Sequence, residues 1–352
     1  MAALQHAEAS LRTRVPARPA MTDDRPSISP EVPVGCVIGV DIGGTKILAG
    51  AVDRDLRVSA RIRRTAPTDD PETLLAAVAG AVAEVRSTVG EEVLGVGYGI
   101  ACLMDAGGRA VASTHLPVAE IAFARVMAER TGLPAYVDND ANLALLAEHR
   151  RGAARGTADA VMLTLGTGIG GGVMVDGRLY RGSRGGAAEL GHMVIWADGP
   201  DCGPGCPSWG CLEALASGTA LVRDARRAAA RHPDSGLGRA LAAGREIDGA
   251  LVSDLAAGGD AVAAAVVAEV GGWLGIGLVN LVNIFNPEVI VVGGGVSDAG
   301  EFLLGPARRV VADRALPMPG EPTRIAAAHF GAESGMLGAA VLAYDSIDRR
   351  AA

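Results

Sequence analysis

A strand, a glycine-rich turn, a second strand and a hairpin turn follow one another twice in this chain. The first copy runs from Asp41 to Asp53 and the second from Thr164 to Asp176, and each spans twelve positions. Runs of β-branched apolar residues flank both turns, as expected for buried strands. The same supersecondary unit repeated with the same spacing indicates a duplicated α/β fold with two lobes around a central cleft. Chance similarity of two glycine-rich hairpins is the alternative.

Hydrophobic patterning places the remaining elements around these two hairpins. The first half is expected to hold strands over 34–41, 46–52, 57–64, 93–101 and 135–137, with a helix that starts at Pro71. The second half is expected to hold strands over 160–165, 170–175 and 287–292, helices over 212–231 and 261–285, and a final helix after Gly335. Strands joined by tight turns and followed by a helix form a ββα-type unit rather than a Rossmann half.

Composition narrows the classes of protein to consider. With 49% apolar residues among 352, the chain can bury a sizeable core. The net charge of −8 argues against a nucleic-acid partner, which needs a basic face. Five cysteines in a chain of this length do not suggest a disulfide scaffold, so we expect a reducing, cytoplasmic location.

Two segments need an interpretation of their own. Residues 1–33 show little apolar periodicity and no apolar core long enough for a signal peptide. We expect them to form a disordered tail, or to lie upstream of a truer start at Met21. The run over 261–285 is apolar enough to resemble a membrane span. Glu269 interrupts it, and a charge at mid-bilayer costs about 2.5 kcal/mol or more, so we expect a buried core helix and no membrane contact.

The turn of the first copy reads DIGGTK over 41–46 and has the chemistry of a phosphate site. Its glycines, Gly43 and Gly44, let backbone N–H groups approach an anion closely. Thr45 adds a hydroxyl and Lys46 a positive charge. Asp41 ends the strand, where a carboxylate can hold a hydrated Mg²⁺ ion. An ordinary β-hairpin is the alternative, but a hairpin needs only the two glycines.

The turn of the second copy reads GTGIGGG over 166–172 and carries no charge. Its centre is Gly166, Thr167 and Gly168. Compared with the first turn, this sequence predicts an anion site that depends more on backbone N–H groups and less on charged side chains. Neither turn is a Walker loop, because the spacing GxxxxGK[ST] does not occur.

Acidic and amide side chains cluster over 138–142, directly after a predicted strand. Helix capping by Asn139 or Asp140 is the simple interpretation, since both residue types are common caps. Capping needs one such residue, however, and here there are four in five positions. A carboxylate at this junction could accept the proton of an attacking hydroxyl, as a general base does in phosphoryl transfer.

A carboxylate and an imidazole, Glu189 and His192, lie three positions apart, and such a pair can bind vicinal hydroxyls of a sugar. Cys202, Cys206 and Cys211 follow within twenty residues. Together with His192 they offer one nitrogen and three thiolates, a set typical of structural Zn²⁺. A metal would also fix this Gly/Pro-rich loop. Free thiols on a mobile loop are the alternative.

Six motifs occur in a fixed order: DIGGTK (41–46), NDAN (139–142), LGTGIGGG (165–172), ELGH (189–192), a cysteine loop ending in GCLE (210–213) and NPEVIVVGGG (286–295). In this order they resemble the ROK family of sugar kinases, most closely its bacterial glucokinases, over roughly 34–343. The resemblance implies an actin-like ATPase (ribonuclease H-like) fold. It implies a small lobe over 34–142, completed by a helix over 335–348, and a large lobe over 143–334 with the zinc loop and an oligomer surface.

The resemblance also implies an activity, the ATP- and Mg²⁺-dependent phosphorylation of glucose at its 6-hydroxyl. By motif matching, Asp140 corresponds to the catalytic base. The sugar ligands correspond to Asn139, Glu189, His192 and Glu213. The turns over 43–46 and 166–168 correspond to phosphate loops, and Gly293 and Gly294 to the turn beside the adenosine. His192 would bind the sugar through one ring nitrogen and Zn²⁺ through the other.

The chain departs from the family pattern in two places. The usual metal motif reads CxCGxxGCxE, whereas Pro204 stands here where a second cysteine would fall. After the fourth strand, the usual proline–glycine pair is replaced by Ala101 and Cys102. We therefore expect Cys102 to pack in the core and not to bind a ligand.

The resemblance leaves other functions open. Fructokinases, mannose kinases and N-acetylhexosamine kinases share these motifs, and some relatives use polyphosphate as the donor. Other relatives are sugar-responsive repressors with an N-terminal DNA-binding domain. In this chain, the segment before the first strand shows no helix–turn–helix pattern. A non-catalytic sugar sensor is a further option. The likeness also suggests a homodimer or homotetramer.

Overall fold

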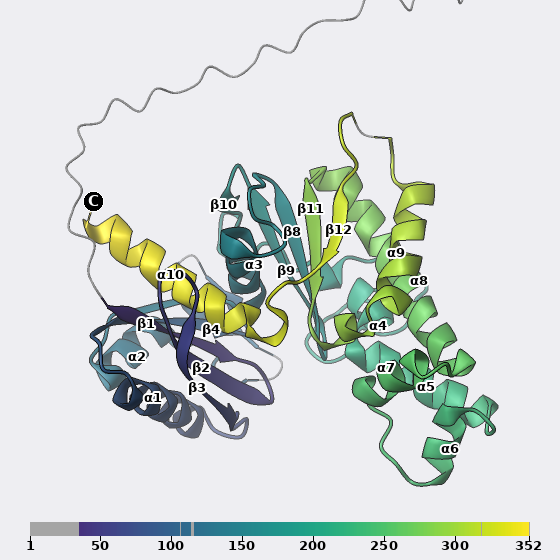
Figure 1. The fold of residues 1–352 in the computed structure, drawn as a ribbon, viewed down its shortest axis with the longest axis horizontal. Coiled ribbons are helices and arrows are strands. Elements are labelled where there is room, and N and C mark those ends of the chain that lie inside the picture. The colour runs from purple at the N-terminus through teal and green to yellow at the C-terminus, as the bar shows by residue number, and fades with distance from the viewer. Residues whose placement is uncertain (1–34, 106, 114–115, 318, 352) are drawn as a thin grey trace, which may run out of the picture. The chain divides into compact units, whose positions relative to one another are not determined.

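Two five-stranded sheets with identical topology form the framework of the computed structural model, which describes residues 35–105, 107–113, 116–317 and 319–351 (Figure 1). The first sheet has the order β3 (Val58–Thr65), β2 (Lys46–Val52), β1 (Cys36–Ile42), β4 (Val93–Ile100), β7 (Ala135–Asn139). The second has the order β10 (Arg178–Leu179), β9 (Ile169–Val175), β8 (Ala160–Leu165), β11 (Val289–Gly293), β12 (Arg324–Ala327). In both, the first three strands are antiparallel and the last two join in parallel. The predicted duplication is therefore confirmed, while the tail over 1–33 and the start at Met21 lie outside the described residues.

Helices surround these sheets. They are α1 (Pro71–Thr88), α2 (Phe123–Thr131), α3 (Asp140–Arg151), α4 (Leu212–Ala216), α5 (Gly218–Arg231), α6 (Gly236–Ala242), α7 (Gly249–Ala257), α8 (Ala261–Phe285), α9 (Glu301–Arg314) and α10 (Ser334–Ala351). A short ribbon, β5 (Leu103–Met104) and β6 (Ala110–Ala112), follows β4, and 3₁₀ turns cover Leu190–His192, Gly295–Ala299 and Gly331–Glu333.

Strand alternation in β1 decides which residues meet α10. Ile38 and Val40 point into the core that contains α1 and α2, whereas Val37 packs with α10 on the other face. Gly39 also faces α10, and a Cβ there would lie 2.0 Å from the carbonyl oxygen of Met336, so only glycine permits this approach. By the same alternation, Asp41 points toward the start of α10.

The second sheet buries both of its faces. Val161 and Leu163 belong to a core formed with α5, α7 and α8, whereas Met162 packs on the opposite face with Ala144 and Leu145 of α3. Helix α3 therefore contacts the second sheet, although it begins at the end of the first.

Helix α8 is, among the described residues, the one helix long and apolar enough to cross a membrane by length and composition. In this fold 56% of its most apolar window is buried. Gly271 and Gly275 bring it against α9, because a Cβ at either position would lie within 3 Å of atoms of that helix. The observed packing is that of the core helix expected from the sequence.

Two expectations about elements were wrong. The helix predicted over 212–231 is two helices, because Ser217 is extended and its side chain accepts a hydrogen bond from the N–H of Ala220, which caps α5. Strand β12 was not predicted at all. It is only four residues long and sits at the edge of its sheet, so it lacks a distinct apolar pattern.

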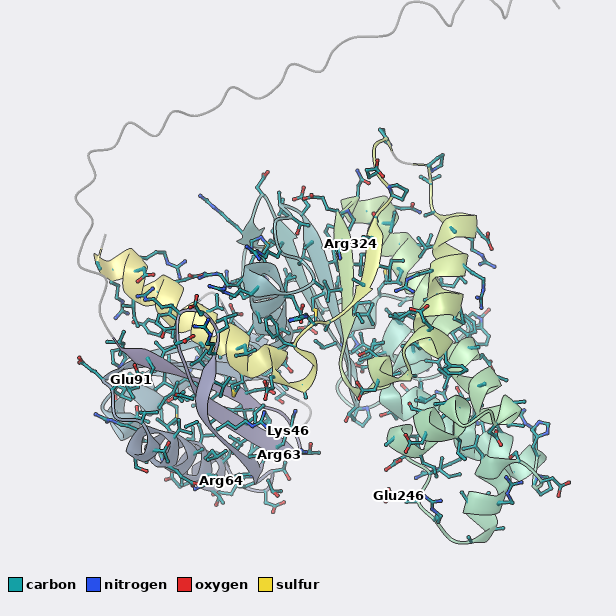
Figure 2. All side chains as sticks on the ribbon, viewed as in Figure 1. Lys46, Arg63, Arg64, Glu91, Glu246 and Arg324 are labelled. Carbon is teal, nitrogen blue, oxygen red and sulfur yellow. The ribbon has the colours of Figure 1, made fainter. Side chains whose placement is uncertain are left out.

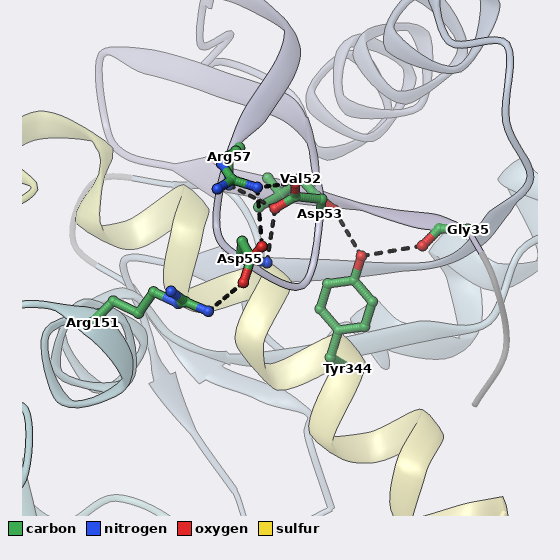
Figure 3. A network of polar contacts seen from close by, with 7 residues as sticks. All are labelled: Gly35, Val52, Asp53, Asp55, Arg57, Arg151 and Tyr344. Carbon is green, nitrogen blue, oxygen red and sulfur yellow. Dashed lines mark hydrogen bonds and ion pairs between the residues drawn. The ribbon is translucent and has the colours of Figure 1, made fainter. Parts of the chain in front are cut away.

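The turn between β2 and β3 is fastened to two helices (Figure 3). Asp53 closes the turn, since its side chain accepts hydrogen bonds from the N–H groups of Asp55 and Arg57, both at 2.8 Å. Arg151 at the end of α3 pairs with Asp55. Tyr344 of α10 donates its hydroxyl proton toward the carbonyl of Val52 at 2.9 Å. Helices α3 and α10 are thus both anchored to the first sheet.

Candidate active site

The N-terminus of α3 presents the predicted base. Asn139 is the helix cap, since its side-chain oxygen accepts from the N–H groups of Ala141 at 2.9 Å and Asn142 at 3.2 Å. Its amide donates to the carbonyl of Cys102 at 3.2 Å. Asp140 accepts from the N–H of Ala141 at 2.9 Å through Oδ1, and Asn139 also interacts with its carboxylate, whereas no hydrogen bond of normal geometry reaches Oδ2 from any described residue. One oxygen of the Asp140 carboxylate is therefore available to a substrate.

The carboxylate of Asp140 lies near enough to Asp41 for its charge to act on that residue. Burial, and then the charge of Asp140, raise the pKa of Asp41 to about 7, while Lys46 acts in the opposite direction. Burial also raises the pKa of Asp140. Both side chains are partly buried and keep some contact with solvent. Two acids held this close favour a divalent cation or a transferable proton.

An ion pair between a buried aspartate and a partly exposed arginine holds this junction in place. Asp138 is 6% exposed and accepts two hydrogen bonds from Arg181, at 2.8 and 2.5 Å. Its other oxygen accepts from the side chain of Asn142 at 3.0 Å and from the N–H of Asn139 at 2.8 Å. Arg181 lies eight positions before Glu189, so the pair connects two parts of the site. Sequence reasoning did not assign a role to Arg181.

The first turn closes as predicted from its pattern, with the N–H of Gly43 donating to the carbonyl of Lys46 at 3.0 Å. Among the described residues, the side chains of Thr45 and Lys46 make no hydrogen bond or ion pair. Lys46 is labelled in Figure 2. Both polar groups are therefore free to meet an anion, although the Lys46 charge also acts on Asp41.

The second turn is held by the start of α5. The N–H of Gly218 donates to the carbonyl of Gly166 at 2.8 Å, and the hydroxyl of Thr219 donates to the carbonyl of Thr167 at 2.8 Å. A Cβ at Gly218 would lie 2.7 Å from the Gly166 oxygen, so glycine is required for this approach. With two carbonyls engaged by α5, the turn is fixed in one conformation. Thr219 is a further residue that the sequence prediction did not include.

Glu213 supports the same turn. Its Oε2 accepts from the N–H of Ile169 at 2.7 Å, and a Cβ at Gly168 would lie 2.3 Å from that oxygen. Its Oε1 lies 3.8 Å from the sulfur of Cys202. Of the predicted sugar ligands, Glu213 is thus, like Asn139, already hydrogen-bonded to the protein backbone. It joins the second turn to the cysteine loop.

Gly293 and Gly294 end β11 beside the second turn. Gly294 has a φ of +84°, and a Cβ there would lie 2.5 Å from the carbonyl oxygen of Leu165, the residue before Gly166. The predicted adenosine-side turn and the second phosphate turn are therefore adjacent. The second hairpin also touches the base, because a Cβ at Gly170 would lie 3.0 Å from the Cβ of Ala141, next to Asp140.

Glu189 and Cys102 face the same acids. Burial raises the pKa of Glu189, with smaller opposing effects of His192, which lowers it, and of Asp140 and Glu213, which raise it. Burial, and next the charge of Asp140, raise the pKa of Cys102 to about 12. The Cys102 side chain is 6% exposed and packs in the first core, as expected, while its carbonyl positions Asn139.

His192, Cys202, Cys206 and Cys211 form a possible metal site, with their ligand atoms all within 4.8 Å of one another. The Nδ1 of His192 lies 3.5 Å from the Cys202 sulfur, and the sulfurs of Cys206 and Cys211 are 3.9 Å apart. Tetrahedral Zn²⁺ with usual bond lengths separates a nitrogen and a sulfur by about 3.6 Å and two sulfurs by about 3.8 Å. The residues fit this ion despite Pro204. Because Nδ1 faces the sulfurs, Nε2 is left for another ligand.

Comparison with known proteins identifies the family. A model of the ROK family matches residues 37–346, nearly all of the described chain. The chain belongs to the ROK family. The glucokinase of Streptomyces coelicolor is 38% identical over 88% of this chain and 98% of its own length. The glucokinase of Thermotoga maritima is 36% identical over the same shares of the two chains.

A solved ROK structure agrees in fold. The glucokinase of Streptomyces griseus, in complex with glucose and AMPPNP, superposes with a TM-score of 0.80 at 38% identity, over 88% of this chain and all of that one. The actin-like ATPase fold predicted from the sequence is therefore confirmed for this ROK protein. The assignment of individual site residues stays a prediction.

Proposed function

We propose that this protein is a glucokinase that transfers the γ-phosphoryl group of ATP to the 6-hydroxyl of glucose. The observation that carries the proposal is the carboxylate of Asp140, partly unbonded, next to Asp41 and between two glycine turns. In addition, the chain is 38% identical to a glucokinase over 88% of its length. The ROK repressors and sensors need no such base.

The proposed mechanism is in-line transfer. Asp140 accepts the proton of the 6-hydroxyl as that oxygen attacks phosphorus, and a positioned general base contributes about 10²–10⁴-fold. Glu189 and the Nε2 of His192 bind the sugar hydroxyls, and the amide of Asn139 is oriented by the Cys102 carbonyl. Backbone N–H groups of the two turns hold the phosphates, so most of the acceleration comes from positioning and charge stabilisation.

Mg²⁺ and Zn²⁺ have separate proposed sites. Mg²⁺ fits beside Asp41, because two close acids with raised pKa values gain most from a cation there. A bound Mg²⁺ ion would neutralise part of the negative charge of the phosphates. Zn²⁺ fits the His192 and cysteine set, where it would fix the loop and the orientation of the imidazole.

Some expectations remain part of the proposal. The small lobe is proposed over 34–142 with the helix over 335–348, and the large lobe over 143–334. The protein is proposed to be a cytoplasmic homodimer or homotetramer with no nucleic-acid or membrane partner.

One experiment tests the function. Glucose, fructose, mannose and N-acetylhexosamines are compared in one coupled assay of ADP release, with ATP and then polyphosphate as donor. We expect glucose with ATP to give the highest kcat/KM. Preference for another hexose would change the substrate, and absence of turnover with every hexose and donor would refute the kinase in favour of a sugar sensor.

A further inference from the structure

Glu148 is a buried carboxylate that the proposed reaction does not use. Its exposure is 0%, and four donors surround it. The N–H groups of Ala153, His329 and Phe330 donate at 2.8, 3.0 and 3.0 Å, and the hydroxyl of Ser334 lies at 3.3 Å. A buried charge is tolerated when it receives this many hydrogen bonds. With four donors, both carboxylate oxygens of Glu148 are hydrogen-bonded, so the side chain is held in one position.

The donors come from both segments in which the chain passes between the two sheets. Helix α3 leads from β7 of the first sheet to β8 of the second, and Ala153 lies just after it. The chain returns between β12 and α10, where Ala328 still bonds to Val292 of the second sheet at 2.9 Å. Glu148 therefore ties the outgoing crossing to the returning one, at the place where relative motion of the two sheets would pivot.

Both crossings end in residues of the active site. Helix α3 begins with Asp140, eight positions and about 12 Å along the helix from Glu148. Ser334, which donates to Glu148, precedes Gly335, where a Cβ would lie 2.7 Å from Oδ1 of Asp41. One helix and one neighbouring residue thus connect Glu148 to the two coupled carboxylates.

We propose that Glu148 is a positioning residue that sets the spacing between Asp41 and Asp140 by locking the start of α10 to the last turn of α3, the helix that begins with Asp140. It touches neither substrate nor metal. This inference rests on the proposed kinase activity, because the spacing of the two acids matters for the attack of the hydroxyl on the phosphate. Gly152 supports the same contact, since a Cβ there would lie 2.1 Å from Oε2 of Glu148.

The substitution Glu148→Gln tests the proposal, because its amide turns an N–H₂ group toward donors and breaks half of the contacts. We expect kcat for glucose to fall about 10- to 100-fold, as small displacements of reacting groups do. The KM for glucose, and glucose binding by calorimetry, should change less than about threefold, since the sugar ligands Glu189 and His192 lie outside α3 and are not moved. Thermal unfolding and circular dichroism establish that the variant is folded at the assay temperature.

A matched control separates positioning from general loss of a carboxylate. Glu288 is an exposed carboxylate that accepts hydrogen bonds from the N–H groups of Ala158 and Asp159, just before β8, and its side chain does not join that segment to the start of α10, so Glu288→Gln should keep a normal kcat. A folded Glu148→Gln enzyme with kcat within twofold of wild type, or an equal loss in Glu288→Gln, overturns the proposal. If Glu148→Gln does not fold, Ser334→Ala decides: a reduced kcat in folded protein supports the proposal, and an unchanged kcat overturns it.

Amide hydrogen exchange distinguishes this inference from the function on which it rests. In Glu148→Gln, the amides of His329 and Phe330 should exchange faster, while those of β1 and β8 stay protected. Unchanged exchange at these two amides overturns the lock itself, whatever the enzyme does. Wild-type protein that turns over no hexose would instead refute the kinase, with the exchange result still reporting on the contact.

Discussion

Replacing Asp41 by asparagine should make the protein more stable and inactive at the same time. In the folded protein, burial and the neighbouring Asp140 raise the pKa of Asp41 from 3.8 to about 7. The folded state therefore binds this proton more tightly than the unfolded chain. The protonated Asp41 carboxyl therefore favours folding at low pH, and this stabilisation is lost as the pH rises from about 4 through about 7.

The size of the effect follows from the shift in pKa. A difference of about 3 pKa units at 1.36 kcal/mol each gives a penalty of about 4 kcal/mol at pH 8, where Asp41 is charged in both states. At pH 5 the folded protein holds the proton, and the penalty is about 2 kcal/mol. An asparagine side chain has nearly the same shape as aspartate and no charge, so Asp41→Asn should gain about these amounts.

Urea unfolding in Mg²⁺-free buffer at pH 5 and pH 8 measures the gain as a shift in midpoint at constant m. Asp69→Asn is the control, because Asp69 is exposed and should show no shift at either pH. Saturating Mg²⁺ should stabilise the wild type more than the variant. An Asp41→Asn protein less stable than wild type at pH 8, or a gain that does not shrink toward pH 5, would show that the two acids are not coupled as described.

Three other substitutions test separate parts of the site. Asp140→Asn should abolish turnover while calorimetry still detects glucose binding, and a near-normal kcat would remove Asp140 from its role as base. In the wild type, kcat should fall at acidic pH with a midpoint above the ordinary pKa of an aspartate, because burial raises the pKa of Asp140; a midpoint near 4 would contradict this. Cys206→Ala should lose about one Zn²⁺ per chain by metal analysis and weaken glucose binding, and active metal-free protein would refute the structural metal. Arg181→Met leaves one oxygen of Asp138 without a donor and should cost about 2–3 kcal/mol in unfolding free energy, whereas a loss below about 0.5 kcal/mol would mean that the pair behaves as an exposed one.

Local patterns predicted the framework because its hairpins are local. Asp176 and Gly177 both have positive φ, as the tight turn between β9 and β10 requires, and the sequence pair alone indicates this. The capping alternative at 139–140 was partly right, since Asn139 caps α3 while Asp140 keeps a free oxygen. Asn139 thus confirms the capping interpretation, while the role of Asp140 as a base stays a prediction.

Long-range contacts were beyond the reach of pattern reasoning. Glu148 meets its partners 181 to 186 positions away, and Arg181 meets Asp138 at a separation of 43. The sequence carries only a weak signal, because Glu148 directly follows the apolar run 143–147 but precedes three basic residues, as an exposed acid at a helix end would. No comparable signal marks Arg181, whose side chain is 41% exposed and resembles any surface arginine.

The close contact between α10 and β1 has a consequence for biosynthesis. The last strand of the first sheet leaves the ribosome roughly 200 residues before the C-terminal helix that covers Gly39 and meets Asp41. At about 5–20 residues per second, the nascent sheet waits about 10–40 s with one apolar face open. The N-terminal half is therefore the part most exposed to chaperones during translation, and the helix that contacts Asp41 docks only after synthesis ends.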